Sequence, residues 1–111
     1  MSGSYLARLT DDLEAISSHY AQRHGIHRDS SWFLLKVHEE LGELTQAYLM
    51  RTGQARDKGH TPAELDQAFR SELADVLCQL LLLARHHDVD LQAEINHKWM
   101  PHHPAREPSQ P

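Results

Sequence analysis

Apolar residues recur at helical spacing through three segments of the chain, and this periodicity limits the possible folds more than any other sequence feature. The three stripes consist of Leu6, Leu9, Leu13, Ile16 and Tyr20; of Leu34, Val37, Leu41, Leu44 and Tyr48; and of Leu65, Phe69, Leu73, Val76, Leu80 and Leu83. Steps of three and four residues place side chains on one side of an α-helix. No segment carries a clear strand or hairpin pattern. The sequence therefore predicts an all-α fold.

Glycine and serine residues mark the boundaries of the first two predicted helices. Gly25 can adopt the left-handed conformation that commonly follows the last turn of a helix, so the first helix is expected to end there. Ser30 or Ser31 is the expected N-cap of the second helix, because a serine hydroxyl can accept a hydrogen bond from the first turn. This helix is expected to end at residues 51–53, where a polar, glycine-containing loop begins.

The third helix has the clearest predicted start in the chain. Residues 61–64 read Thr-Pro-Ala-Glu, which places threonine at the N-cap, proline in the first helical position and glutamate in the third. This capping box predicts a helix that continues to about His86. Asp90 is the expected N-cap of a short fourth helix that ends near Trp99, just before a proline.

The chain has 111 residues, the length of a single domain. We expect residues 1–100 to form one helical domain, and residues 101–111, which contain four prolines, to form a disordered tail. Nearly every residue between Val76 and Ala84 is apolar. A helix that is apolar on all sides is buried on more than one side, so this segment predicts a subunit interface in a homodimer or homotetramer.

The charge and cysteine content exclude several classes of protein. The net charge of −5 argues against a nucleic-acid-binding protein, because such proteins present basic surfaces. Cys78 is the only cysteine, so no disulfide can form within one chain, and a reducing compartment is favoured. The first residues lack the apolar core of a signal peptide, and the run at residues 80–84 is too short to cross a membrane. These features predict a soluble, cytoplasmic protein.

Five carboxylates lie beside the apolar stripes of the second and third helices. Glu39, Glu40 and Glu43 are helical neighbours on the second helix, and Glu72 and Asp75 are three residues apart on the third. Two carboxylates about 5 Å apart repel each other by roughly 0.8 kcal/mol in water and by about 3 kcal/mol at an effective dielectric of 20. A solvated acidic face tolerates this repulsion. Beside a helix–helix contact the repulsion favours a bound cation, and oxygen ligands suit Mg²⁺.

The two acidic stretches resemble the signature of a known enzyme family. The sequence EELGE at residues 39–43, followed by ELAD at residues 72–75, is similar to the EExxE…ExxD signature of the MazG-like, all-α nucleoside triphosphate pyrophosphohydrolases. The resemblance extends over residues 31–100. It implies a four-helix bundle that works as a dimer or a dimer of dimers. It also implies Mg²⁺-dependent cleavage of (d)NTPs between the α and β phosphates, giving (d)NMP and pyrophosphate, with Mn²⁺ as an alternative ion.

The resemblance also implies roles for individual carboxylates. It assigns Glu40, Glu43, Glu72 and Asp75 as metal ligands, each pair separated by three residues on its helix. Glu39 is the additional acid and the expected catalytic residue, which would orient or deprotonate the attacking water or help to hold a second ion. The implied cellular role is to clean or control the nucleotide pool.

Substrate contacts are expected from other parts of the chain. The resemblance implies that Lys98 approaches the substrate phosphates and that Asn96 lies near positions used for substrate contacts. Trp32 can stack on a base or pack in the core. Lys36 is expected to contact Glu40 on the helix surface. Further cations lie in the loop after the second helix, where solvation is the more common role of such residues: Arg51, Arg56 and Lys58.

Three other interpretations of the acidic residues remain. A phosphoribosyl-ATP pyrophosphatase shares the implied fold and the cleaved bond. A non-catalytic, metal-binding oligomerisation module would keep the acids without turnover. A di-iron bundle needs two Glu-x-x-His pairs, and only Glu94 and His97 fit that pattern. The ten histidines are irregularly spaced, so we interpret them as surface residues.

Overall fold

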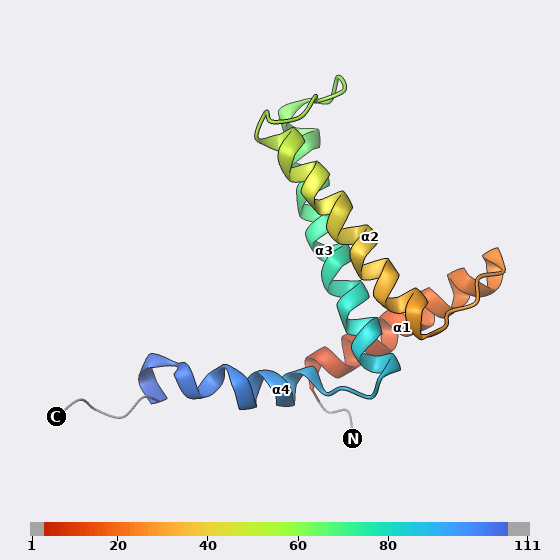
Figure 1. Ribbon diagram of the computed structural model, residues 1–111, viewed down its shortest axis with the longest axis vertical. Helices are drawn as coiled ribbons and strands as arrows, with labels where there is room; N and C mark the ends of the chain where they lie inside the picture. Colours follow the sequence, from red (N-terminus) through yellow and green to blue (C-terminus); the bar gives the residue numbers. More distant parts are fainter. Residues whose placement is uncertain (1–3, 107–111) are drawn as a thin grey trace.

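All the regular structure of the computed structural model, which describes residues 4–106, is helical (Figure 1). The elements are α1 (Tyr5–His24), α2 (Ser30–Arg51), α3 (Pro62–His86), α4 (Leu91–Lys98), and the short 3₁₀ helices η1 (Met100–His102) and η2 (Pro104–Arg106). The predicted all-α fold is confirmed. No helix in the described part of the chain combines the length and apolar character needed to cross a membrane.

The long helices α2 and α3 form an antiparallel hairpin, and α1 crosses its base (Figure 1). Helix α4 leads away from this base in another direction, so the described residues do not close a four-helix bundle within one chain. The buried core is small. Its most enclosed side chains are Phe33, Leu81 and Leu82, each 3% exposed. A bundle built from this chain would therefore need helices from another molecule.

The helix boundaries largely follow the predictions from the sequence. Gly25 ends α1 with φ of 64°, as expected. The predicted N-cap of α2 was wrong. Asp29 caps this helix, with its carboxylate accepting the Trp32 N–H at 2.7 Å, and Ser30 is the first helical residue. Aspartate is as good an N-cap residue as serine, and the positive end of the helix dipole also stabilises its negative charge.

Both caps predicted for the second half of the chain are confirmed. The Thr61 hydroxyl accepts a hydrogen bond from the Glu64 N–H at 3.2 Å, and the Glu64 carboxylate accepts one from the Thr61 N–H at 2.8 Å. Asp90 caps α4 by accepting the Ala93 N–H at 3.0 Å. The segment predicted to be disordered begins at residue 101. Its described part contains η2 and most of η1, and residues 107–111 lie outside the described residues.

An ion-pair and stacking network joins α1 to the base of the hairpin. Arg28 donates hydrogen bonds to both carboxylate oxygens of Glu14, at 2.9 and 2.7 Å, and this contact holds the pKa of Glu14 below its ordinary value. The Arg28 guanidinium lies 5.2 Å from the centre of the Phe33 ring. His86 stacks on the same ring at 4.5 Å and lies 3.2 Å from the Ser30 hydroxyl. These contacts fix the start of α2 against the end of α3 and thereby set the pairing of the two helices.

Candidate metal centre

Three glutamates from the two hairpin helices converge on one point. One carboxylate oxygen from each of Glu40, Glu43 and Glu72 lies within 4.8 Å of the other two. Glu40 and Glu43 lie one turn apart on α2 and therefore share a side of that helix. Glu72 reaches the same point from α3, because the antiparallel pairing places the middle of each helix beside the other. The predicted ligands Glu40, Glu43 and Glu72 therefore come together in space.

Two of these carboxylates each bury an oxygen that has no hydrogen-bond partner. They are Oε2 of Glu40 and Oε2 of Glu72. A buried polar atom without a partner costs free energy, and such atoms are uncommon in folded proteins. Protonation or a cation would each remove this cost. The observation separates the cluster from an ordinary acidic helix surface, on which every oxygen contacts water.

Burial and mutual repulsion favour the protonated form of the cluster in the absence of a metal. Burial raises the pKa of Glu40 from its ordinary 4.5 to about 7, and the neighbouring carboxyl of Glu43 adds to the rise, followed by Asp75 and Glu72. Burial also raises the pKa of Glu72, with the negative charges of Glu43 and Asp75 contributing. One site thus contains two carboxyl groups whose ionised forms are disfavoured.

Asp75 lies at the edge of this cluster. Its oxygens are not part of the convergent group, and the residue is exposed. It is nevertheless close enough for its negative charge to raise the pKa of both Glu40 and Glu72. The structure thus provides three converging carboxylates and one nearby acid at the positions of the four metal ligands that the resemblance implied.

Glu39 points toward solvent beside the cluster. Its side chain is 53% exposed, and Lys36 Nζ lies 3.3 Å from both of its oxygens. The expected contact between Lys36 and Glu40 was therefore wrong: the lysine pairs with the more exposed carboxylate, which costs less desolvation. Lys36 Nζ also lies 5.8 Å from the centre of the Trp32 ring, which packs edge-on against Phe33. Trp32 is half-buried, so its ring retains some access to solvent.

The other predicted substrate residues lie far from the carboxylates within one chain. Lys98 and Asn96 belong to α4, which extends away from the hairpin (Figure 1). The cations at residues 51–58 lie at the opposite end of the hairpin, where Arg51 forms an ion pair with Asp66 at 3.1 Å. The structure thus does not bring these groups to the three glutamates.

Gln79 is a residue that the sequence analysis missed. Its Oε1 atom is buried without a hydrogen-bond partner, like the two glutamate oxygens. It lies seven residues after Glu72 and four after Asp75, on the side of α3 that carries the acids. The sequence did contain a signal for Gln79, because it is a polar residue within an otherwise apolar segment. The helical repeat places its amide one to two turns from the cluster.

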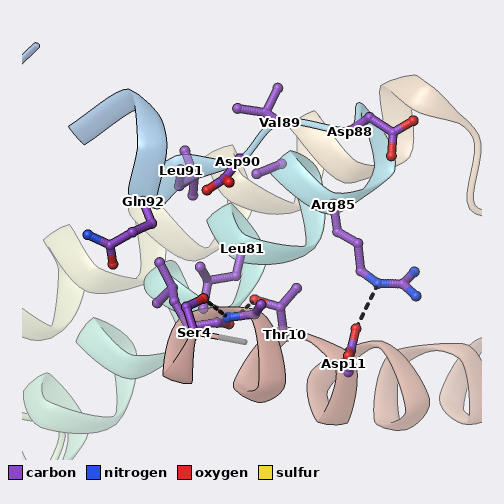
Figure 2. A pocket seen from close by; sticks show the side chains of 13 residues that line it. Ser4, Thr10, Asp11, Leu81, Arg85, Asp88, Val89, Asp90, Leu91 and Gln92 are labelled. Atoms are coloured by element: carbon purple, nitrogen blue, oxygen red, sulfur yellow. Dashed lines mark hydrogen bonds and ion pairs between the residues drawn. The ribbon is translucent and has the colours of Figure 1, made fainter. Parts of the chain in front are cut away.

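A separate hollow lies at the base of the molecule. It has a volume of about 470 Å³ and is bounded by the start of α1, the end of α3 and the start of α4 (Figure 2). On one side of the hollow, Arg85 Nε lies 3.6 Å from Asp11 Oδ1 and forms an ion pair with it. Its walls also carry Thr10, Leu81 and Leu91 and contain none of the five acids of the motif. The hollow is therefore distinct from the carboxylate cluster.

Comparison of the chain with protein-family models, curated proteins and solved structures found no match. The similarity to the MazG-like enzymes consequently depends on the acidic motif and its helical context alone. The convergence of the three glutamates is independent of that similarity.

The metal-free protein is expected to lose stability as the pH rises from about 4.5 to about 7, the interval between the ordinary and the raised pKa of Glu40. In this interval the folded chain binds more protons than the unfolded chain, so deprotonation favours unfolding. Thermal unfolding at several pH values measures the effect, with Glu40→Gln as the variant that removes this contribution and Glu94→Gln as the control on α4. Mg²⁺ should restore the stability of the wild type above pH 7. An identical pH dependence of stability in wild type and Glu40→Gln would contradict a raised pKa of Glu40 in the folded chain.

Proposed function

We propose that the chain is a Mg²⁺-dependent nucleotide pyrophosphohydrolase that cleaves (d)NTPs between the α and β phosphates. The observation that supports this most strongly is the convergence of Glu40, Glu43 and Glu72, two of which each bury an unpartnered oxygen. A bound cation would give these two oxygens the partner that they lack in the metal-free chain. The resemblance of the acidic motif to the MazG-like enzymes then supplies the reaction, with a nucleotide-pool role in the cytoplasm.

The donor set fits Mg²⁺, with Mn²⁺ as a close substitute. All the donors are carboxylate oxygens, which both ions accept. Mg²⁺ commonly binds through a few carboxylates and leaves its remaining positions for water and substrate phosphates. Three converging glutamates and Asp75 at the edge match this requirement. Gln79 provides an additional amide one to two turns away.

The residues around the cluster divide into ligands and a candidate base. Glu40, Glu43 and Glu72 would hold the ion, with Asp75 completing the set. Glu39 is exposed beside them, so its carboxylate is available to accept a proton from an attacking water. When bound, the ion would polarise the phosphoryl oxygens and stabilise the leaving pyrophosphate.

Substrate binding requires groups that one chain does not assemble at the cluster. Trp32 is on the same helix and can stack on a base from its half-buried position. Lys98 and Asn96 can reach the phosphates only through movement of α4 or from another copy of the chain. The family resembled here works as a dimer or a dimer of dimers, and we propose the same for this protein.

One observation favours a second candidate function, a non-catalytic metal-binding module. The cations considered for phosphate binding lie on α4 or at the far end of the hairpin. Lys36 lies beside the cluster but is paired with Glu39. A triphosphate carries about four negative charges and needs positive groups as well as the ion. A protein that only binds the metal would not need them.

Turnover with a panel of substrates distinguishes these functions. The purified protein is incubated with each NTP, each dNTP and phosphoribosyl-ATP in the presence of Mg²⁺, and the products are separated. Pyrophosphate together with the nucleoside monophosphate is the expected result. Preference for phosphoribosyl-ATP would indicate a phosphoribosyl-ATP pyrophosphatase instead. Release of orthophosphate, or no turnover with any substrate, would refute the proposal.

A further inference from the structure

The hollow at the base of the molecule has the size and the walls of a small-molecule binding site. Its volume of about 470 Å³ falls within the roughly 300–1,000 Å³ that is usual for ligand pockets. Three separate helices enclose it (Figure 2). A ligand bound there would bury apolar surface of its own, because the walls are largely aliphatic and contain Leu6, Ala7, Leu81, Ala84, Val89 and Leu91.

The turn that closes one side of the hollow is fixed by backbone hydrogen bonds. The Asp88 N–H donates to the Arg85 carbonyl at 3.1 Å, and the φ of Asp88 is 56°. The Val89 N–H donates to the Ala84 carbonyl at 2.9 Å. This left-handed turn reverses the chain after α3 and leads it along the edge of the hollow to Asp90, which caps α4. The hollow is therefore formed before any ligand binds, as is usual for binding sites.

The polar atoms around the hollow include acceptors that no donor in the described residues satisfies. Thr10 is only 8% exposed, and its hydroxyl donates its proton to the Leu6 carbonyl at 2.7 Å, so its lone pairs remain for a ligand. Asp90 uses Oδ1 to cap α4 by accepting the Ala93 N–H, which leaves Oδ2 to accept from another donor. A ligand with N–H donors suits these atoms.

The charges of the walls also favour a cation. One basic residue, Arg85, lines the described hollow together with three acids, Asp11, Asp88 and Asp90. Arg85 is already shared between two acids, since its Nε lies 3.6 Å from Asp11 and its Nη1 lies 3.9 Å from Glu14. No basic side chain in the described part of the chain forms an ion pair with Asp88 or Asp90. Two carboxylates at the rim of an apolar hollow thus have no positive partner.

We propose that the hollow binds a small organic cation, an amine that carries an apolar body. The aliphatic walls cover the body, and the ammonium group donates to acceptors at the rim, with Asp90 as the principal one. A carboxylate or phosphate ligand is disfavoured, because it would face the two aspartates that lack a positive partner. The inference goes beyond nucleotide hydrolysis and holds whether or not the glutamate cluster binds a metal.

The test compares three probes of similar size that differ in charge: phenethylamine, 2-phenylethanol and 3-phenylpropionate. Each is titrated into the full ¹⁵N-labelled chain, and the amide signals are followed by two-dimensional NMR. The amine should bind saturably and shift the signals of residues 4–11 and 81–92. Its affinity should exceed that of the alcohol by about 10-fold or more, the usual effect of a charge-assisted hydrogen bond. The carboxylate should bind more weakly than the alcohol.

Three variants locate the bound amine. Asp90→Asn keeps a good N-cap residue and removes the charge, so amine affinity should fall about 10-fold while alcohol affinity stays the same. Glu94→Gln is the matched control, because it also removes one carboxylate from α4 but does not line the hollow. It should bind the amine like the wild type. Ala7→Leu adds bulk to the wall and should weaken binding of the amine and the alcohol alike.

Three results would overturn the proposal. Absence of saturable amine binding at millimolar concentration would show that the hollow is not a ligand site. Equal affinity for the three probes would show that the walls do not select a cation. Equal losses in Asp90→Asn and Glu94→Gln would show that the amine responds only to the net charge of the chain. If Ala7→Leu does not fold, the comparison of Asp90→Asn with Glu94→Gln decides.

Discussion

Replacing Glu43 with glutamine is expected to reduce Mg²⁺-dependent turnover by roughly 100-fold or more, because even residues that only support a metal ligand commonly cost 10- to 100-fold. Glu43 contributes an oxygen to the convergent group and also raises the pKa of both other members. The neutral amide keeps the shape of the side chain and removes its charge. Turnover is measured as pyrophosphate release at saturating Mg²⁺.

Two further variants sharpen this prediction. Asp75→Asn should also lower turnover, with a smaller loss than Glu43→Gln if Asp75 binds the ion from the edge of the cluster. Glu94→Gln removes a carboxylate from α4 and should retain the wild-type rate. Circular dichroism must show that all three variants keep their helices. Near-wild-type activity in folded Glu43→Gln would show that the ligand assignment is wrong.

Replacing Phe33 with alanine is expected to destabilise the fold by about 3–5 kcal/mol, the usual cost of deleting a buried aromatic ring. Phe33 is 3% exposed and stacks on His86 at 4.5 Å. The Arg28 guanidinium lies on the same ring, so the variant should also loosen the contact between α1 and the hairpin. Urea unfolding followed by circular dichroism measures the loss.

Leu35→Ala is the matched control for this experiment. The residue lies two positions after Phe33 on the same helix but is 62% exposed. Its truncation should change the free energy of unfolding by less than about 0.5 kcal/mol. A loss of similar size in both variants would mean that the base of the hairpin does not contain the stabilising core described above.

The local features of the fold were predictable because they depend on neighbouring residues. The capping box at residues 61–64 and the glycine that ends α1 each involve contacts over a few positions. The N-cap of α2 was misassigned because Asp29 and Ser30 are both good caps, and the choice depends on the backbone conformation at each position. Sequence alone does not resolve such a difference of one residue.

The candidate site was predictable in part for the same physical reason. A separation of three residues places Glu40 and Glu43 together on any helix, and an antiparallel hairpin can bring Glu72 beside them. The direction of α4 was not predictable, because it depends on the few residues between α3 and Asp90. One of these, Asp88, has φ of 56°, a conformation that aspartate adopts only occasionally. This turn determines how far Lys98 lies from the carboxylates.

Binding of Mn²⁺ to the metal-free protein, followed by electron paramagnetic resonance, tests most directly whether the three glutamates form a divalent-cation site. We expect saturable binding that Mg²⁺ displaces and that is greatly reduced in Glu40→Gln. The binding should also weaken as the pH falls below about 7, where Glu40 takes up a proton. Absence of saturable binding, or equal affinity in wild type and Glu40→Gln, would contradict a divalent-cation site at these glutamates.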